Sequence, residues 1–225
     1  MSSKESKRVS TVKDRWKSKK WMAIELPHYL GRKKIAEIPV THSTIGRTIE
    51  IYYSDITENI EDSDKKIKLQ VIKESENIAK TEVKKYEIRY DVVNGRVRRG
   101  TTLVETIFDV ETKDKYKYRL RVMAIVKGRA KRRQAKMIRK IAVEFFTKKA
   151  NTMTHGQFLE GIVNDSLNEE YRRAIFHVAP IEMDSVEVIK LKTLTKLPEL
   201  IKKAEQKAKK ETAVQEGEER EEQSA

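Results

Sequence analysis

The spacing of the apolar residues changes abruptly at Val126, and this change constrains the fold more than any other feature of the sequence. Up to Val126 the stretch YKYRLRVMAIV (116–126) alternates between two faces, one of them apolar, as a β-strand does. After a turn that Gly128 permits, the apolar stripe recurs at intervals of three or four residues: Ala130, Gln134, Ile138, Ile141 and Phe145. The sequence therefore predicts a strand followed by an amphipathic helix of about five turns.

The strand before Val126 is half of a predicted hairpin, whose other strand is GTTLVETIFDVE (100–111) and whose turn is TKDK. The outer face of residues 116–126 begins basic and turns apolar near its end. Alternating patterns predict further strands at residues 34–40, 46–56, 66–74 and 185–195. Pro39 indicates an edge or a bend, the stretch 81–93 is ambiguous, and the dipeptide Asn94–Gly95 after it is typical of a turn.

Helical signals dominate the last third of the chain. Thr154 and Gln157 have the spacing of a capping box, and a third helix is expected over residues 168–178, capped by Asn168 and ended by Pro180. Met137, Ile138 and Ile141 are expected to hold the basic helix against the sheet. The order of elements predicts an α+β fold with a mostly antiparallel sheet or a partly closed β-barrel, because no alternation of strand and helix runs through the chain.

Three segments are expected along the chain. Residues 1–20 are predicted to form an extended basic arm with no core of its own, disordered when free. Residues 21–200 form an α+β RNA-binding domain, with the sheet at 35–126 and the helices and late strand at 129–200. Residues 201–225 form a basic helix that passes into an acidic, partly disordered tail.

The net charge of +14 comes from a few blocks of the sequence. Residues 1–34 carry a net charge of +8 and residues 127–150 carry +9, whereas residues 211–225 carry −5. Such a concentration of cations costs self-repulsion unless a polyanion neutralises it. Nucleic acid is the first partner to consider, and an anionic membrane surface is the second.

The sequence contains no constellation of residues that indicates catalysis or a cofactor. There is no cysteine, and the four histidines have no ligand spacing, so no metal site is expected and His155 and His177 are assigned structural roles. Neither phosphate-cradling glycine motif is present, and the acids of ENIEDSD (58–64) lack the pattern of a calcium loop. No signal peptide or membrane span is predicted, which is typical of an intracellular, soluble protein.

The run VKGRAKRRQAKMIRK (126–140) has three interpretations. A solvated helix face normally places an acid one turn from each cation, but residues 127–140 contain none. A membrane-surface helix needs a bulkier apolar face. Binding to the phosphates of RNA or DNA fits best, and RNA is favoured because no DNA-binding motif is present and because a basic arm, a basic hairpin face and a basic helix suit an irregular RNA surface.

The basic blocks supply the candidate RNA-binding residues. Trp16 is either a stacking residue or a core anchor, and Trp21 is expected to anchor the arm to the domain. The full set of candidates is Lys13, Arg15, Trp16, Lys17, Lys19, Lys20, Arg32, Lys33, Lys34, Arg96, Arg98, Arg99, Lys127, Arg129, Lys131, Arg132, Arg133, Lys136, Arg139 and Lys140.

Four stretches, taken in order, resemble the S-three-A-e (e-S-one) family of archaeal and eukaryotic small-ribosomal-subunit proteins. They are VKDRWKSKKWMAIELP, GRTIEIYYSDI, VETIFDVETKDKYKYRLRVMAIVKGRAKRRQAKMIRKI and HVAPIEMDSVEVIKLKTLTK, which together cover most of residues 12–200. No single motif is specific, but their order and spacing are. The lack of cysteine and the short acidic tail fit an archaeal member.

The resemblance implies a structural protein of the cytoplasmic ribosome, without catalytic activity or cofactor. It implies a place on the platform of the small subunit near the mRNA exit, with ribosomal RNA, neighbouring ribosomal proteins and, near the exit site, mRNA as partners. Neither a membrane nor a small-molecule substrate is expected. The alternative is a free-standing RNA-binding factor or RNA chaperone that associates transiently with ribosomes.

Overall fold

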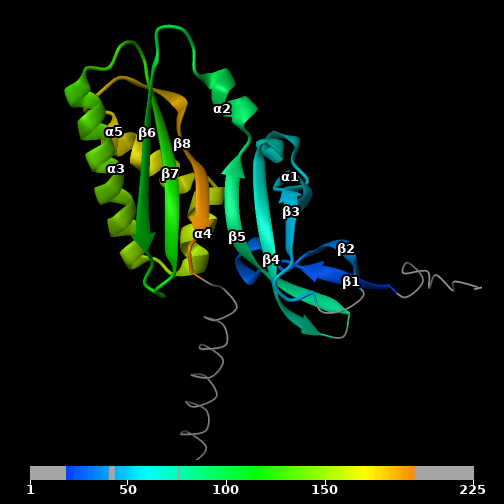
Figure 1. Ribbon diagram of the computed structural model, residues 1–225. Coiled ribbons are helices and arrows are strands. Elements are labelled where there is room, and N and C mark those ends of the chain that lie inside the picture. Colours follow the sequence, from blue (N-terminus) through cyan, green and yellow to red (C-terminus); the bar gives the residue numbers. More distant parts are fainter. Residues whose placement is uncertain (1–18, 41–43, 76, 196–225) are drawn as a thin grey trace, which may run out of the picture.

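The computed structural model describes residues 19–40, 44–75 and 77–195, which fold around one eight-stranded sheet (Figure 1). The strands are β1 (Lys20–Glu25), β2 (Lys34–Val40), β3 (Thr48–Tyr52), β4 (Lys65–Ser75), β5 (Ile78–Ile88), β6 (Thr102–Glu111), β7 (Lys117–Val126) and β8 (Ile181–Thr193). The helices are η1 (His28–Leu30), α1 (Ser54–Thr57), η2 (Ile60–Asp64), α2 (Tyr90–Arg96), α3 (Arg132–Thr152), α4 (His155–Val163) and α5 (Ser166–Ile175).

The strand order along the sheet is β2-β1-β5-β8-β7-β6, with β4 paired to β5 and β3 paired to β4. One edge of β5 carries β4, and the other edge carries β1 at its start and β8 at its end. Every described pairing is antiparallel except β1 with β5. The predicted α+β fold with a mostly antiparallel sheet is therefore confirmed, and the sheet is not closed into a barrel.

The predicted hairpin and helix are present. β6 and β7 pair in register from Thr102 opposite Val126 to Glu111 opposite Lys117, and α3 follows β7 after a short turn. Helices α3, α4 and α5 cover one face of β6, β7 and β8, as Figure 1 shows. The alternation of residues 116–126 explains this layer, because its apolar face needs a cover.

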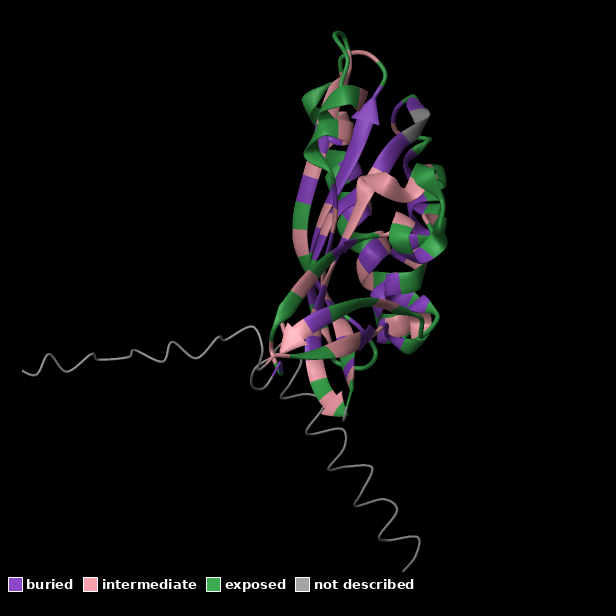
Figure 2. Ribbon diagram, turned by 90° about the vertical axis from the view of Figure 1, so that its right-hand side faces the viewer, coloured by how far each residue is buried: buried purple, intermediate pink, exposed green. Residues whose placement is uncertain are grey.

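The core lies between this part of the sheet and the three helices. Tyr118, Leu120 and Val122 of β7 are almost completely buried, as are Phe146 of α3 and Phe158 of α4. Each large side chain removed from water in this way contributes roughly 1.5–3 kcal/mol. Figure 2 shows the same division, with buried residues along the strands and exposed residues on the outer turns of the helices.

The late strand β8 joins the earlier sheet, as predicted, by lying between β7 and β5. Arg121 pairs with Lys190 while the next residue, Val122, pairs with Val188, so β8 carries one extra residue, Ile189. Both Val188 and Ile189 are buried because this bulge moves the apolar residues of β8 from one parity to the other. The strict alternation predicted for residues 185–195 does not include this change in which residues are buried.

Three local predictions near helices have different outcomes. The capping box is confirmed, since the Thr154 amide donates to Gln157 Oε1 at 3.2 Å. The prediction for Asn168 was wrong, because α5 begins at Ser166 after Asp165, and Asn168 lies inside the helix and donates from Nδ2 to Asp165 Oδ1 at 2.7 Å. The turn expected at Asn94–Gly95 was also wrong, since both residues lie in α2.

The termini fall largely outside the described residues. Of the arm predicted over residues 1–20, only Lys19 and Lys20 are described, and Lys20 is already the first residue of β1. The helix and acidic tail predicted at residues 201–225 lie wholly outside, as do the last five residues of the predicted domain. The three-segment division therefore stays a prediction.

Candidate nucleic-acid interface

The α3 basic surface consists of the eight cations of the β7–α3 turn and the first half of α3, and all eight side chains are exposed: Lys127, Arg129, Lys131, Arg132, Arg133, Lys136, Arg139 and Lys140. Gly128 makes the turn possible, with φ at 87°. The start of the helix is fixed by Gln134, whose Oε1 accepts from the Lys131 amide at 2.9 Å while its Nε2 donates to the Val178 carbonyl at 3.1 Å.

The helix presents these cations to solvent because its opposite face is buried. Ile138, Ala142, Phe146 and Ala150 recur every four residues and are inaccessible to solvent. Ile141 packs partly against the core, as expected, but the same expectation for Met137 was wrong, since its side chain is 47% exposed. Met137 precedes Ile138 by one residue, about 100° around the helix, and so lies beside the buried stripe.

Few of these cations have an internal partner. Lys140 Nζ lies 3.7 Å from Glu144, and Arg139 Nε donates to the Glu105 carbonyl at 3.1 Å. For the other six, no carboxylate of the described residues forms an ion pair. Like charges one turn apart repel each other, so this surface gains from an external polyanion.

Arg98 and Arg99 lie at the same end of the sheet as the start of α3, in the loop between α2 and β6. Thr102, the first residue of β6, ties the two segments together: its Oγ1 donates to the Gly128 carbonyl at 2.9 Å and accepts from the Ala130 amide at 3.0 Å. Both arginines are exposed. The structure thus joins two groups of candidates that lie about 30 residues apart in sequence.

Arg96 differs from its neighbours Arg98 and Arg99. Its Nη1 lies 2.5 Å from Glu187 Oε2 on β8, and both side chains are largely shielded from water. Burial raises the pKa of Glu187, although the Arg96 guanidinium opposes this effect. Arg96 therefore serves the contact between α2 and β8, and its guanidinium is not presented to solvent as those of Arg98 and Arg99 are.

The open face of the hairpin carries cations that are paired, in contrast to those of α3. We name this set of cross-strand ion pairs the hairpin ladder: Lys117–Glu111, Arg119–Asp109 and Arg121–Glu105. Arg119 donates to both oxygens of Asp109, at 2.8 and 2.9 Å, which holds the pKa of that carboxyl below its usual value. The basic hairpin face expected from the sequence is therefore neutralised by β6.

The N-terminal candidates lie at the other end of the sheet. Lys20, Arg32, Lys33 and Lys34 are exposed on or beside β1 and β2, and Lys19 is partly exposed. Lys33 Nζ contacts Glu58 at 3.5 Å. Because the sheet runs from β2 to β6, this group and the α3 basic surface form two separate surfaces (Figure 1). The remaining candidates, Lys13, Arg15, Trp16 and Lys17, lie outside the described residues.

The expectation that Trp21 anchors the arm was wrong, because its side chain is 58% exposed. Trp21 pairs with Pro39 across β1 and β2, and this pair faces outward, whereas the neighbouring pair Met22–Ile38 faces the core. The apolar stretch after Trp21 predicts burial, but the alternation of a strand places Trp21 on the opposite face from Met22.

A cluster of polar side chains around His155 links several elements of the fold. His155, at the start of α4, lies with Nε2 2.6 Å from Glu82 Oε1 and with Nδ1 hydrogen-bonded to the Tyr118 hydroxyl, and its ring stacks on Tyr116 with centroids 4.2 Å apart. Tyr29 also donates to Glu82, and burial raises the pKa of Tyr29. These contacts join η1, β5, β7 and α4. The capping motif placed His155 at a helix start but gave no sign of these partners.

Other classes of site find no support in the structure. Within residues 19–40, 44–75 and 77–195, no three His, Asp or Glu side chains come together as metal ligands. Among the helices of that same part of the chain, none is both long and apolar enough to cross a bilayer.

Comparison with known proteins gives a consistent result. The model of the ribosomal S3Ae family matches residues 7–197. The small ribosomal subunit protein eS1 of Pyrobaculum neutrophilum is 35% identical over 215 residues, which cover 95% of this chain and 94% of that protein. The proteins of the same name from Desulfurococcus amylolyticus and Archaeoglobus fulgidus are 33% and 29% identical, over 84% and 81% of this chain and 89% and 90% of theirs.

Proposed function

The chain belongs to the ribosomal S3Ae family, and from this premise we propose that the α3 basic surface, together with Arg98 and Arg99, binds ribosomal RNA. As a member of this family, the chain is a structural protein of the small ribosomal subunit, of the archaeal eS1 type. It acts in translation on the cytoplasmic ribosome. It is not an enzyme. What the proposal adds is which surface meets the RNA and how.

One observation carries the proposal: seven of the eight exposed cations of the α3 basic surface have no ion-pair partner in the part of the chain that the structure describes. An RNA backbone supplies the missing anions, and neutralising its phosphates releases condensed counterions. Arginine matches two phosphate oxygens at once with its planar guanidinium, and lysine adds a point charge. The surface has cations and no aromatic platform of the kind that reads bases, so backbone contact is the expected mode.

The N-terminal group supplies a second contact in this proposal. The β1–β2 end of the sheet carries Lys19, Lys20, Arg32, Lys33 and Lys34. The candidates Lys13, Arg15, Trp16 and Lys17 precede β1 in the sequence. Two basic surfaces at opposite ends of one sheet suit binding to two separate RNA segments. They equally suit RNA on one surface and a neighbouring ribosomal protein on the other. We further propose a position on the platform near the mRNA exit, with mRNA as a neighbour.

Gradient sedimentation and salt titration test this function. The protein, supplied to ribosomes that lack it, is expected to co-sediment with small subunits through a sucrose gradient at low salt. Affinity of the free protein for small-subunit RNA is expected to fall roughly 10³–10⁵-fold between 50 and 200 mM salt if six to ten phosphates are neutralised. A flat salt response contradicts the backbone-contact proposal, and a protein that stays in the supernatant at low salt supports a free-standing RNA-binding factor instead.

A further inference from the structure

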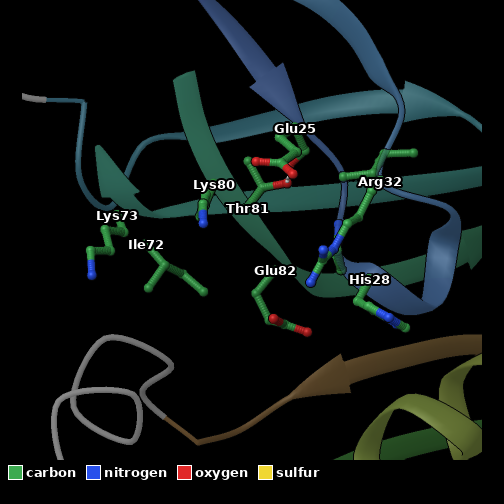
Figure 3. Close-up of a pocket in the computed structure, with 10 residues that line it drawn as sticks. Glu25, His28, Arg32, Ile72, Lys73, Lys80, Thr81 and Glu82 are labelled. Carbon is green, nitrogen blue, oxygen red and sulfur yellow. Dashed lines mark hydrogen bonds between the residues drawn. The ribbon is translucent and has the colours of Figure 1, made fainter. Parts of the chain in front are cut away.

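Several locally unfavourable features converge on one cleft away from the α3 basic surface. The cleft encloses about 360 Å³ between the segment that follows β1 and the bulged part of β4 and β5. Its cationic lining residues are Arg32, Lys73 and Lys80, and Ile72, Glu25, His28 and Glu82 line it too (Figure 3). Natural ligand pockets have volumes of a few hundred cubic ångströms, so the cleft has room for a small ligand.

The first feature is a β-bulge at Ile72. Val71 pairs with Thr81 while Lys73 pairs with Lys80, so Ile72 is an extra residue on β4. A bulge interrupts the ladder of hydrogen bonds and turns a side chain in a new direction, and bulges concentrate beside functional sites. Here it directs Ile72 into the cleft as its partly exposed apolar wall.

The second feature is the pairing of two cations. Lys73 and Lys80 are direct cross-strand partners in the antiparallel pair β4–β5. Lys80 is exposed, and no side chain described in the structure forms an ion pair with it. An anion between Lys80 and Arg32 therefore meets a cation on each side.

The third feature is the backbone of Arg32. Its φ is 50°, directly after Gly31 at 93°, so two consecutive residues adopt the left-handed region and the second is not glycine. Such a conformation is uncommon for a long side chain and costs free energy that the fold must offset. Figure 3 shows the Arg32 guanidinium directed into the cleft toward Glu82 and His28. None of the described carboxylates forms an ion pair with it.

No acid of the cleft that the structure describes forms an ion pair with Arg32 or Lys80. Glu82 Oε1 accepts from Tyr29 and lies 2.6 Å from His155 Nε2, so one oxygen of that carboxylate is engaged by these two residues. Glu25 lies on the opposite wall, where Thr81 Oγ1 donates to its backbone carbonyl at 2.8 Å. The cleft therefore combines a cationic rim with one apolar wall, and the carboxylate residues Glu25 and Glu82 line it as well.

We propose that this cleft receives one nucleotide, with its phosphate against Arg32 and Lys80 and its base against Ile72. The phosphate meets the Arg32 guanidinium and the Lys80 ammonium, and the apolar face of the base covers Ile72. The inference rests on the proposed function, because the nucleotide is then one that ribosomal RNA turns out of its base stack. The same chemistry also describes a free mononucleotide, and the experiment separates the two sources.

The test maps backbone amide shifts in ¹⁵N-labelled full-length protein. Probes are AMP, adenosine and inorganic phosphate, each at millimolar concentration, and a five-nucleotide single-stranded RNA. AMP is expected to shift the amides of Arg32, Ile72 and Lys80 in a saturable way, at least about tenfold more tightly than phosphate or adenosine. The oligonucleotide is expected to bind more tightly than AMP if the source is RNA; tighter binding of AMP assigns the cleft to a free nucleotide and overturns the RNA source.

Variants separate this inference from the proposed function. Arg32→Gln with Lys80→Gln is expected to weaken AMP binding about tenfold or more while leaving the far end of the sheet intact. The matched control, Arg132→Gln with Arg133→Gln, removes the same charge from α3 and is expected to leave AMP binding unchanged. If the control weakens AMP as much, or if phosphate binds as tightly as AMP, the nucleotide site is wrong although RNA binding by α3 stands.

Discussion

The hairpin ladder and the α3 basic surface are neighbours in sequence and opposites in structure. Residues 117–121 and residues 127–140 are both rich in Lys and Arg, and both face solvent. On the hairpin, each cation meets an acid of β6; on α3, seven of eight cations meet no acid among the described residues. The comparison teaches that a large number of cations does not by itself indicate a nucleic-acid interface. The absence of internal ion-pair partners is what leads us to propose the α3 basic surface as one.

Geometry explains the difference. In the antiparallel pair β6–β7, residues directly opposite each other share a face, and the register places Asp109 opposite Arg119 and Glu111 opposite Lys117. Glu105 lies opposite Met123 and reaches Arg121 diagonally, two residues along on the same face. In a helix the neighbours are three and four residues away along the same chain. From Lys127 the first acid along the chain is Glu144, so the first half of α3 has no carboxylate of its own within reach.

The largest expected effect comes from removing four cations of the α3 basic surface, of which Lys140 alone has an ion-pair partner among the described residues. The variant Arg132→Gln, Arg133→Gln, Lys136→Gln, Lys140→Gln is expected to bind small-subunit RNA on the order of 10²–10³-fold more weakly near physiological salt, with a salt slope about three units smaller. The physical reason is the loss of four phosphate contacts and their counterion release. Filter binding at several salt concentrations measures both quantities, and incorporation into small subunits is expected to fall with them.

A variant with four substitutions in the hairpin ladder is the matched control. Arg119→Gln, Arg121→Gln, Asp109→Asn and Glu105→Gln leave the net charge unchanged and remove two ion pairs. RNA affinity is expected to change less than about threefold, since those cations are already neutralised. Circular dichroism checks that both variants stay folded. If the α3 variant is unfolded, the cations of residues 127–140 have a structural role. If both variants lose the same affinity for RNA, the two regions do not differ in RNA binding.

A smaller effect is expected from giving α3 an internal partner. Met137 is exposed, and Arg133 and Lys140 lie four residues before and three residues after it. Met137→Glu is expected to stabilise the helix by a few tenths of a kcal/mol and to weaken RNA binding about five- to tenfold. Met137→Gln controls for the change of shape. If the Met137→Glu variant binds RNA as tightly as the Met137→Gln variant, the α3 basic surface does not bind RNA.

The smallest effect concerns pH. The hydrogen bonds from Arg119 lower the pKa of Asp109 from its ordinary value of 3.8. A carboxyl whose folded pKa is lowered contributes stability above its unfolded pKa, and that contribution is lost as the pH falls through the folded pKa. Asp109→Asn is therefore expected to flatten the loss of stability below about pH 4, measured by urea unfolding at several pH values. A wild-type protein whose acid sensitivity equals that of Asp109→Asn contradicts the role of the Arg119–Asp109 pair.

Much of the fold could be predicted because its signals are local. The alternation of residues 116–126, the three-to-four spacing after Val126 and the Thr154–Gln157 cap all depend on neighbours within a few residues. Other outcomes depended on contacts between distant segments. Trp21 is exposed because β1 pairs with β2 on the face away from the core, and Arg96 differs from Arg98 and Arg99 because it pairs with Glu187, on a strand about 90 residues later.

The sequence by itself determined the strands, the long helix and the placement of eight cations in one unbroken run, because period and charge are properties of neighbouring residues. Only the tertiary structure decided which cations remain without partners. Strand register neutralised the hairpin, Thr102 brought Arg98 and Arg99 to the start of α3, and a bulge at Ile72 formed a cleft with Arg32. Each of these depends on how distant segments meet, since ion pairs and clefts are made by side chains that the chain order does not place together.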